Sequence, residues 1–249
     1  MTIIDTFDSS TEAVIDPALA PPIDGFPKIA VAAFGDRFIA ALHDSYEPKL
    51  ISEMHACVTV PVYQISYEGK AIAVYGSTLG GPAAAVLLEL MISKGSEKFV
   101  FFGSCGVLDR DITAKSLIIP TAAYRDEGTS YHYAPPGEYI EIATAPRLAE
   151  VFSELKLPHV CGKTWTTDAF FRETRGNVEK RKNGGCITVD MEFASIMAAA
   201  QFRGVEAYQF MYAADSLDEA EWDARILGGL PWDAREMFLR VALEAAVRV

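Results

Sequence analysis

Residues Gly185–Leu217 read GCITVDMEFASIMAAAQFRGVEAYQFMYAADSL, in which two apolar runs flank a segment with apolar side chains at helical spacing. The first run, CITV, is typical of a short buried strand, and the helical pattern that follows it stops at Gly204. The second run, VEAYQFMYAAD, is typical of another buried strand. Because strand, helix and strand alternate, this stretch predicts an α/β fold.

Acidic residues lie at the borders of these apolar runs. Asp190 and Glu192 fall at the strand-to-helix junction, and Asp215 falls at the carboxyl end of the second strand, where open α/β sheets bind ligands. Acidic residues are also favoured as caps and in the first turn of any helix. The pattern alone leaves two interpretations open: the acids are caps, or two neighbouring strands aim Glu192 and Asp215 at one pocket.

The rest of the sequence continues the alternation of strands and helices. We expect strands at residues 28–34, 98–103, 116–122 and 158–168, a hairpin over 58–77, and helices near 35–44, 80–95, 144–157, 173–185 and 230–249. This order predicts a single-domain three-layer sandwich with a central mixed β-sheet flanked by helices, over residues 26–249. Residues 1–25 lack periodicity, and we expect them to form an N-terminal arm, with a disordered segment as the alternative.

Composition limits the function. The formal charge of −12 argues against nucleic-acid binding and means that an anionic co-substrate must be attracted by local groups. Apolar runs stay shorter than the roughly 18 to 20 residues of a membrane span, and the N-terminus lacks a signal-peptide pattern. We therefore expect a soluble, cytoplasmic protein without a membrane partner.

The cysteines and histidines show no metal-ligand spacing such as CxxC or HExxH. The cysteines are Cys57, Cys105, Cys161 and Cys186, and they are far apart in the sequence. We predict reduced, buried thiols and no metal.

Several segments resemble the nucleoside phosphorylase family, which holds purine nucleoside phosphorylases, uridine phosphorylases and related nucleosidases. Residues 189–217, VDMEFASIMAAAQFRGVEAYQFMYAADSL, are similar to its V-E-M-E…S-D signature. STLGGPAAAVLLELMISKG, FVFFGSCGVLDRDI, IIPTAAYRDEGTSYHYAPP and TWTTDAFFRET resemble further family segments, in the same order. The likeness runs from about Lys28 to Val249 and is strongest to a bacterial nucleoside phosphorylase-like branch.

The resemblance implies roles for the acidic residues. Glu192 would bind the ribose hydroxyls and favour positive charge on the sugar, while Met191 would cover the apolar sugar face. Asp215 matches the aspartate that meets the purine, and desolvation in an apolar strand would raise its pKa. A pyrimidine substrate remains an alternative, since Arg172 and Arg175 are present, although without the glutamine that uridine phosphorylases pair with arginine.

The segment TWTTDAFFRET would form the base pocket. Phe170 and Phe171 lie where relatives place a ring against the base, and Thr166 and Thr167 offer hydroxyl groups. Core packing is the alternative for each phenylalanine.

The phosphate site departs from the family pattern. Gly35, Gly80 and Ser104 remain as donors in the nucleophile pocket, but the arginine of the first turn is displaced to Arg37 and Phe101 replaces a strand arginine. Residues 55–58 also lack the arginine that relatives supply from the partner subunit.

The implied activity is that of a pentosyltransferase: cleavage of a purine nucleoside with phosphate to give free base and pentose 1-phosphate. Three accounts of the nucleophile follow: Arg37 or Arg125 approaches the phosphate, water replaces it in a nucleosidase, or the protein binds a nucleoside without turnover. The resemblance implies no organic cofactor, phosphate as a possible co-substrate, and a homo-oligomer, either a dimer or a trimer of dimers.

Overall fold

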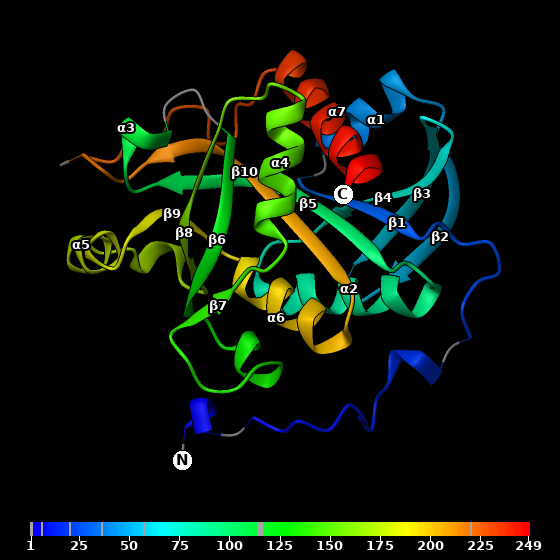
Figure 1. Ribbon diagram of the computed structural model, residues 1–249, viewed down its shortest axis with the longest axis horizontal. Coiled ribbons are helices and arrows are strands. Elements are labelled where there is room, and N and C mark those ends of the chain that lie inside the picture. The colour runs from blue at the N-terminus through cyan, green and yellow to red at the C-terminus, as the bar shows by residue number, and fades with distance from the viewer. Residues whose placement is uncertain are drawn as a thin grey trace.

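Ten strands form one mixed sheet in the computed structural model, which describes residues 2–5, 7–19, 21–35, 37–56, 58–113, 117–219 and 221–249 (Figure 1). The strands are β1 (Ile29–Phe34), β2 (Lys49–His55), β3 (Thr59–Tyr67), β4 (Lys70–Ser77), β5 (Lys98–Val107), β6 (Leu117–Asp126), β7 (Tyr139–Glu141), β8 (His159–Thr167), β9 (Cys186–Asp190) and β10 (Glu206–Ser216). Their order is β10-β6-β8-β9-β5-β1-β4-β3-β2, and β7 pairs with β6. The central mixed sheet is confirmed.

Part of the sheet closes on itself. Strand β5 pairs with β1 and β10 in parallel and with β9 in antiparallel, and β10 also meets β6. The strands β5, β10, β6, β8 and β9 therefore form a ring, from which β1, β4, β3 and β2 extend. The expectation that β9 and β10 are direct neighbours is wrong, because β5 pairs with both. Two strands that flank β5 can still direct their carboxyl ends at one site.

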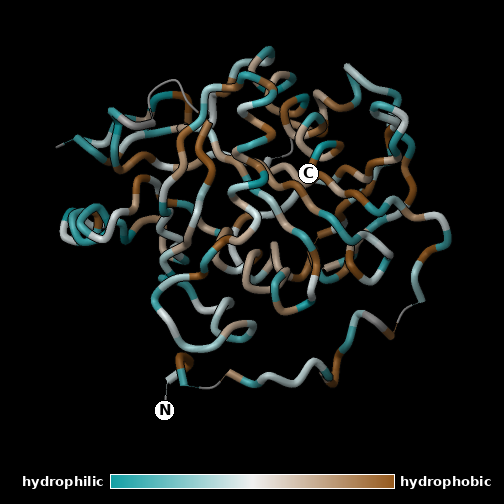
Figure 2. The backbone as a smooth tube through the Cα atoms, viewed as in Figure 1, coloured by the Kyte–Doolittle hydropathy of each residue, from teal (hydrophilic) through white to brown (hydrophobic). Residues whose placement is uncertain are grey.

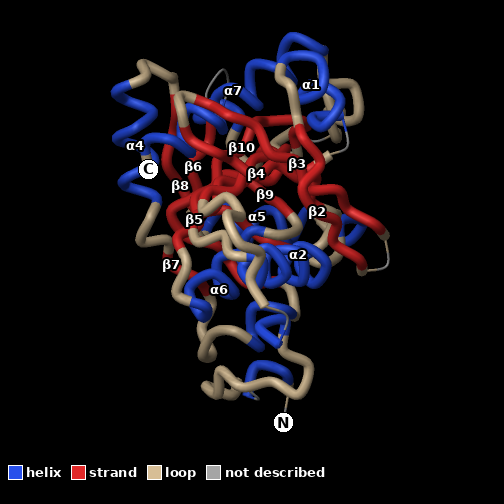
Figure 3. Tube along the Cα trace, turned by 90° about the vertical axis from the view of Figure 1, so that its right-hand side faces the viewer, coloured by secondary structure: helices blue, strands red, loops and turns tan. Residues whose placement is uncertain are grey.

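Helices cover both sides of the sheet. They are α1 (Arg37–Ser45), α2 (Gly81–Lys94), α3 (Arg110–Thr113), α4 (Ala145–Glu154), α5 (Arg175–Asn183), α6 (Phe193–Arg203) and α7 (Trp232–Arg248). Helices α2 and α6 lie together on one side, while α1, α4 and α7 lie on the other (Figures 1 and 3). The predicted arrangement of helices around a central sheet is thus confirmed. Within the described ranges, none of these helices has the length and apolarity needed to cross a membrane.

Helix α6 is buried almost throughout, as its apolar sequence indicates. Every residue from Phe193 to Ala200 is buried, so the helix packs on the sheet and on α2 together. The helix ends at Gly204, whose φ of 69° is a left-handed conformation that glycine adopts without strain. Arg203, near this end, donates to the Glu89 carboxylate of α2 at 2.9 and 2.8 Å. The start of α6, which carries the acidic cluster, is therefore firmly placed.

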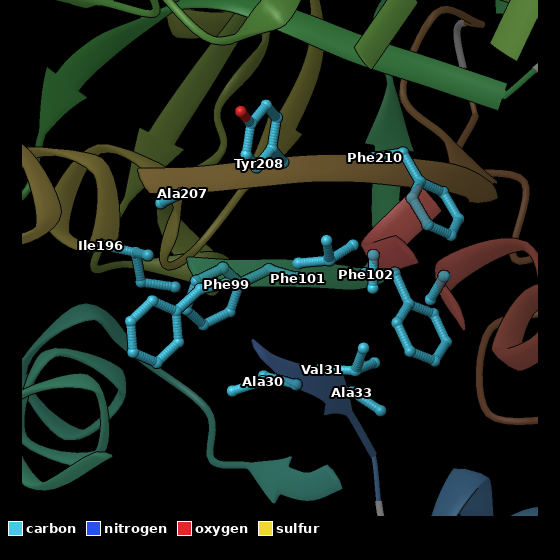
Figure 4. Packing of buried hydrophobic residues seen from close by; sticks show 14 of the residues in the cluster. Ala30, Val31, Ala33, Phe99, Phe101, Phe102, Ile196, Ala207, Tyr208 and Phe210 are labelled. Atoms are coloured by element: carbon cyan, nitrogen blue, oxygen red, sulfur yellow. The ribbon is translucent and has the colours of Figure 1, made fainter. Parts of the chain in front are cut away.

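The core lies on both sides of β5. Phe99, Phe101 and Phe102 are fully buried on this strand, and Phe102 stacks on Phe210 of β10 with ring centroids 5.5 Å apart (Figure 4). Apolar residues follow the inner strands, whereas α5 is hydrophilic along most of its length (Figure 2). The buried strands β5 and β10 thus hold in place the residues at their own carboxyl ends.

The N-terminal residues run along the outside of the body, below α2 and α6 (Figure 1). They include two short 3-10 turns, η1 (Ile3–Asp5) and η2 (Pro17–Leu19), and the Thr11 carbonyl accepts a hydrogen bond from Arg203. Among the described residues the buried core begins at Phe26. The division into an arm over 1–25 and a domain over 26–249 stays a prediction.

Several local features differ from the expectation, among them the short elements α3 and β7, which are not predicted. Strand β2 is not predicted, because its sequence KLISEMH mixes charged and apolar residues and only Met54 is buried on this edge strand. Of the cysteines, Cys105 and Cys186 are buried and Cys161 is exposed, all three as free thiols, while Cys57 lies outside the described residues.

Candidate active site

A cavity of about 820 Å³ opens at the carboxyl ends of β1, β5, β9 and β10. Its wall includes Phe34 of β1, residues 104–106 of β5, residues 190–192 at the start of α6, Asp215 of β10, and residues 168–173 from the connection between β8 and α5. Glu192 and Asp215 therefore share one cavity. Ser104, Met191, Phe170 and Phe171 line the same cavity.

Asp190 is a helix cap. Its Oδ2 accepts the backbone N–H groups of Glu192 at 2.9 Å and Phe193 at 2.6 Å, and its Oδ1 accepts the hydroxyls of Thr164 at 3.1 Å and Thr166 at 2.9 Å. Burial raises the pKa of Asp190 to about 6, although these hydrogen bonds oppose the rise. Because four donors occupy both oxygens, the capping interpretation accounts for this residue.

Glu192 has a different environment. It is 8% exposed, and its Oε1 accepts the backbone N–H of Gly80 at 2.7 Å. Burial, with a smaller contribution from the Asp190 charge, raises its pKa to about 8. The Gly80 N–H, expected as a donor in the nucleophile pocket, thus binds Glu192 instead. Gly80 itself is not among the residues that form the cavity wall.

The end of β10 directs Asp215 at the cavity. The pairing of β10 with β5 shifts between Ala213 and Asp215, which is the irregularity of a β-bulge, and places Asp215 opposite Gly106. A Cβ atom at Gly106 would lie 3.4 Å from Asp215 Oδ1 and 2.8 Å from the side chains of Leu217 and Val189. Glycine is therefore required for this close approach.

Trp222 covers the Asp215 carboxylate from the loop before α7. Its Nε1–H donates to Asp215 Oδ2 at 2.7 Å, although the tryptophan itself is 57% exposed. Burial raises the pKa of Asp215, while the bond from Trp222 opposes the rise. Sequence reasoning missed Trp222 because it follows a polar loop without a recognisable motif.

The two phenylalanines form part of the cavity wall. Phe170 is 37% exposed and Phe171 is 91% exposed, with their ring centroids 5.1 Å apart in an edge-to-face arrangement. Core packing therefore does not explain them. Thr167 is buried beside the wall, and its hydroxyl accepts the Ala169 N–H at 3.3 Å. The segment between β8 and α5 thus presents two aromatic rings to the cavity, and the buried Thr167 supports this segment through its hydrogen bond.

Glu173 is a further acid on the cavity wall. It follows the 3-10 turn η4 (Phe170–Arg172) and lines both the main cavity and a smaller neighbour of about 260 Å³. Burial, with smaller contributions from the charges of Asp215 and Asp190, raises the pKa of Glu173 to about 8. The predicted helix over 173–185 gave Glu173 no role, and its position two residues after the aromatic pair was the available signal.

A second compartment, of about 240 Å³, adjoins the main cavity beside Ser104. The residues that line both are Phe34, Gly35, Ser104 and Leu227. Arg37 and Arg235 line the compartment as well, so two cationic side chains lie next to the proposed nucleophile pocket. The closing helix α7, which carries Arg235, gave no motif in the sequence.

Both arginines use only part of their hydrogen-bonding capacity. Arg37 Nη1 donates to the Gly228 carbonyl at 2.6 Å, and Arg235 Nη2 donates to the Leu230 carbonyl at 2.6 Å. The Nε of Arg235 is buried and has no partner among the described residues. Tyr212 lines the same compartment; burial raises its pKa, and the nearby Ser104 hydroxyl and Arg235 charge oppose the rise, so these groups are close together.

Arg125, the other arginine considered for phosphate, is held elsewhere. Its guanidinium donates to the Ser130 hydroxyl at 2.8 Å and to the carbonyls of Pro135 at 2.6 Å and Ala134 at 3.3 Å, and it stacks over Tyr131. These contacts organise the loop after β6 and leave Arg125 outside the cavity wall.

The family model of the phosphorylase superfamily matches residues 28–246. The chain belongs to the phosphorylase superfamily. It is 28% identical to the guanosine phosphorylase of Halorubrum lacusprofundi over 150 residues, which are 59% of this chain and 61% of that protein. It is 26% identical to a DeoD-type purine nucleoside phosphorylase of Bacillus cereus over 160 residues, which are 63% of this chain and 68% of that protein. The match thus spans about three fifths of the guanosine phosphorylase.

Solved structures agree on the fold of the superfamily. The purine nucleoside phosphorylase from Toxoplasma gondii in complex with immucillin-H superposes with a TM-score of 0.73 and 16% identity, over 96% of this chain and 98% of that one. The uridine phosphorylase from Vibrio fischeri gives a TM-score of 0.75 and 16% identity, over 96% and 100%. At this identity the likeness establishes the shared architecture.

Proposed function

We propose that this protein cleaves the N-glycosidic bond of a purine nucleoside with phosphate, releasing the free base and pentose 1-phosphate. The observation that carries the proposal is the convergence of Glu192 and Asp215 on one cavity of about 820 Å³, a size that accommodates a nucleoside. The names of the similar proteins, guanosine phosphorylase and purine nucleoside phosphorylase, support the same reaction.

Glu192 would act on the sugar. Its carboxylate can accept hydrogen bonds from two ribose hydroxyls, and these bonds favour the charged form that stabilises an oxocarbenium-like transition state. Because burial raises the pKa of Glu192 to about 8, ribose binding would be coupled to ionisation of the group. Met191 lines the same wall and would cover the apolar face of the sugar.

Asp215 would act on the base. The departing purine gains negative charge, and a protonated carboxyl that meets a ring nitrogen neutralises it. Burial favours this protonated form by raising the pKa of Asp215, and Trp222 orients the carboxyl through its hydrogen bond. Phe170 and Phe171, which line this part of the cavity, would pack against the base.

Phosphate would approach from the compartment beside Ser104. Arg37 and Arg235 supply positive charge there, and the buried Arg235 Nε provides a donor without a protein partner in the described part of the chain. These two arginines would replace the family arginines that are absent at Phe101 and in residues 55–58.

Hydrolysis is the second candidate. Phe101 is fully buried in the core, and both compartment arginines already bind backbone carbonyls, which favours water over a phosphate dianion as the nucleophile.

The proposal also includes a cytoplasmic location and a homo-oligomer. Both rest on the resemblance to the family. The homo-oligomer is further supported by two exposed apolar residues, Leu79 just before α2 and Val86 on α2.

The test is product analysis with a panel of purine and pyrimidine nucleosides, in the presence and absence of phosphate. Phosphorolysis predicts free base and pentose 1-phosphate only when phosphate is added. Free base with free pentose at the same rate in both buffers would establish hydrolysis instead. Nucleoside binding without any product would contradict both enzymatic candidates.

A further inference from the structure

Glu127 is a buried acid that lies outside the residues of the cavity wall. It ends the connection between β6 and the 3-10 turn η3 (Thr129–His132), and only 7% of it is exposed. Its Oε2 accepts the Ser195 hydroxyl of α6 at 2.6 Å and the backbone N–H of Ser130 at 3.0 Å. Its Oε1 is buried and has no partner within the described ranges. Glu127 thus joins the loop after β6 to α6 through one oxygen.

Ser195 lies between Glu127 and the start of α2. It is fully buried, and a Cβ atom at Gly81 would lie 2.1 Å from its Oγ and 2.9 Å from its Cβ. Only glycine permits so close an approach, so α2 and α6, which lie side by side in Figure 1, touch at this point. The bond to Glu127 therefore fixes the direction of the Ser195 hydroxyl where it meets Gly81.

The same turn of α2 holds Glu192. Gly80 precedes Gly81, and its N–H donates to Glu192 Oε1 at 2.7 Å. Ser195 follows Glu192 by three residues, so both side chains lie on one face of the first turn of α6. The contacts Glu192 to Gly80 and Gly81 to Ser195 therefore form a closed circuit. A displacement of Ser195 against Gly81 moves the N–H that holds Glu192.

A carboxylate is an expensive group to bury for the sake of a single serine. Here it lies one hydroxyl away from the first turn of α2, the positive end of a helix, where negative charge is favourable. We infer that Glu127 is a positioning residue, which holds Ser195 against the glycine turn and so fixes the carboxylate of Glu192 for the pentose hydroxyls. The inference rests on the proposed function.

The experiment compares nucleosides with and without these hydroxyls. Inosine and adenosine are each paired with their 2′,3′-dideoxy analogues, which offer Glu192 no hydroxyl to bind. Dissociation constants are measured by calorimetry without phosphate, and kcat/KM is measured with phosphate. A general loss of folded protein weakens both members of a pair equally, whereas a misplaced Glu192 weakens only the ribonucleoside.

The full-length variants are Glu127→Leu, the conservative Glu127→Gln, and Ser195→Ala, which leaves Glu127 in place. Ser130→Ala is the matched control, because it removes a buried hydroxyl from the same loop that binds Arg125 at 2.8 Å and does not contact Ser195. Thermal melting verifies that each variant is folded. If Glu127→Leu does not fold, Ser195→Ala decides alone.

We expect wild type to bind each ribonucleoside about ten-fold or more tightly than its dideoxy analogue. Glu127→Leu and Ser195→Ala should lower this ratio by about three- to five-fold, and the double variant should lower it no further because both changes remove one bond. Glu127→Gln should keep most of the ratio, since its amide oxygen can still accept from Ser195. Ser130→Ala should keep the ratio even where it lowers the melting temperature.

Three results would overturn the role of Glu127. The first is a wild-type ratio in folded Glu127→Leu or Ser195→Ala, and the second is an equal loss of affinity for both members of a pair. The third is a fall of the ratio in Ser130→Ala as large as in Glu127→Leu, which would assign the effect to the loop as a whole.

Failure of the proposed function gives a different result. If the ribonucleosides bind but are not cleaved in either buffer, the proposed function is wrong, and the ratios of dissociation constants still decide the role of Glu127. If cleavage occurs and the ratios do not change among the variants, the proposed function stands and the role of Glu127 is wrong. If wild type binds no nucleoside, both are contradicted.

Discussion

The Oε1 atom of Glu192 accepts a hydrogen bond of 2.7 Å from the backbone N–H of Gly80. This bond joins the start of α6 to the turn that begins α2, two segments separated by more than one hundred residues of sequence. Gly80 has a φ of 94°, a conformation that favours glycine, so the turn can present its N–H to the carboxylate. The proposed ribose-binding residue is therefore also held by the fold.

Glu192→Gln should separate these two contributions. The amide oxygen can still accept from Gly80, so the melting temperature should change little, whereas the charge that stabilises the sugar is lost. We expect kcat/KM for the nucleoside to fall by about 100-fold or more. Steady-state kinetics measures this effect, with Glu179→Gln on the exposed face of α5, outside the cavity wall, as the control. A Glu192→Gln variant with nearly normal kcat/KM would remove Glu192 from the proposed mechanism.

Asp190→Ala should mainly affect stability. The substitution removes a buried cap that accepts two backbone N–H groups and two threonine hydroxyls. We expect the free energy of unfolding to decrease by about 2 to 4 kcal/mol, measured by urea denaturation. A decrease below about 0.5 kcal/mol would mean that water or another group replaces the cap.

Trp222→Phe should shift the pH dependence of cleavage. The Trp222 N–H donates to Asp215 and thereby lowers the pKa of that carboxyl, so removal of the donor raises it. If protonated Asp215 assists the leaving base, the alkaline limb of the kcat/KM profile should move upward by about half to one pH unit. A shift to lower pH would contradict the assigned role of Asp215.

Glu173→Gln should change how stability depends on pH. The folded-state pKa of Glu173, about 8, lies above its ordinary value of 4.5, so its contribution is fully present below the ordinary value and is lost as pH rises through about 8. Glutamine does not titrate, so the variant should gain stability relative to wild type across this window. Urea denaturation at about pH 5 and about pH 9 measures the difference in the free energy of unfolding between variant and wild type. If the variant became less stable relative to wild type at the higher pH, the prediction would be wrong.

Arg235→Gln should weaken phosphate use. The arginine lines the compartment beside Ser104, and loss of a charge-assisted contact should raise KM for phosphate by about ten-fold while KM for the nucleoside stays similar. Arg240→Gln, on the exposed side of the same helix, is the control. Equal phosphate KM values in the two variants would exclude Arg235 from the phosphate site.

The local parts of this structure are predictable from sequence. Helix α6 and strand β10 follow from their apolar spacing and from Gly204, and the hairpin at Glu68 and Gly69 follows from alternation around a turn. The closure of β5, β10, β6, β8 and β9 into a ring depends on pairings distant in sequence, which periodicity does not encode.

The site was predictable to a similar degree. The cavity shared by Glu192 and Asp215 follows from their positions at the ends of strands, whereas the cap role of Asp190 became distinct only with its four hydrogen-bond donors. Glu173 and Arg235 lie in charged or amphipathic segments that look solvated in the sequence. Their place on the cavity walls results from tertiary packing.

The most direct test is a crystal structure with a C-nucleoside, whose carbon–carbon glycosidic bond cannot be cleaved. The account predicts the pentose hydroxyls within hydrogen-bonding distance of Glu192 and the base beside Asp215, in the same cavity. A ligand bound elsewhere, or with its pentose directed away from Glu192, would contradict it.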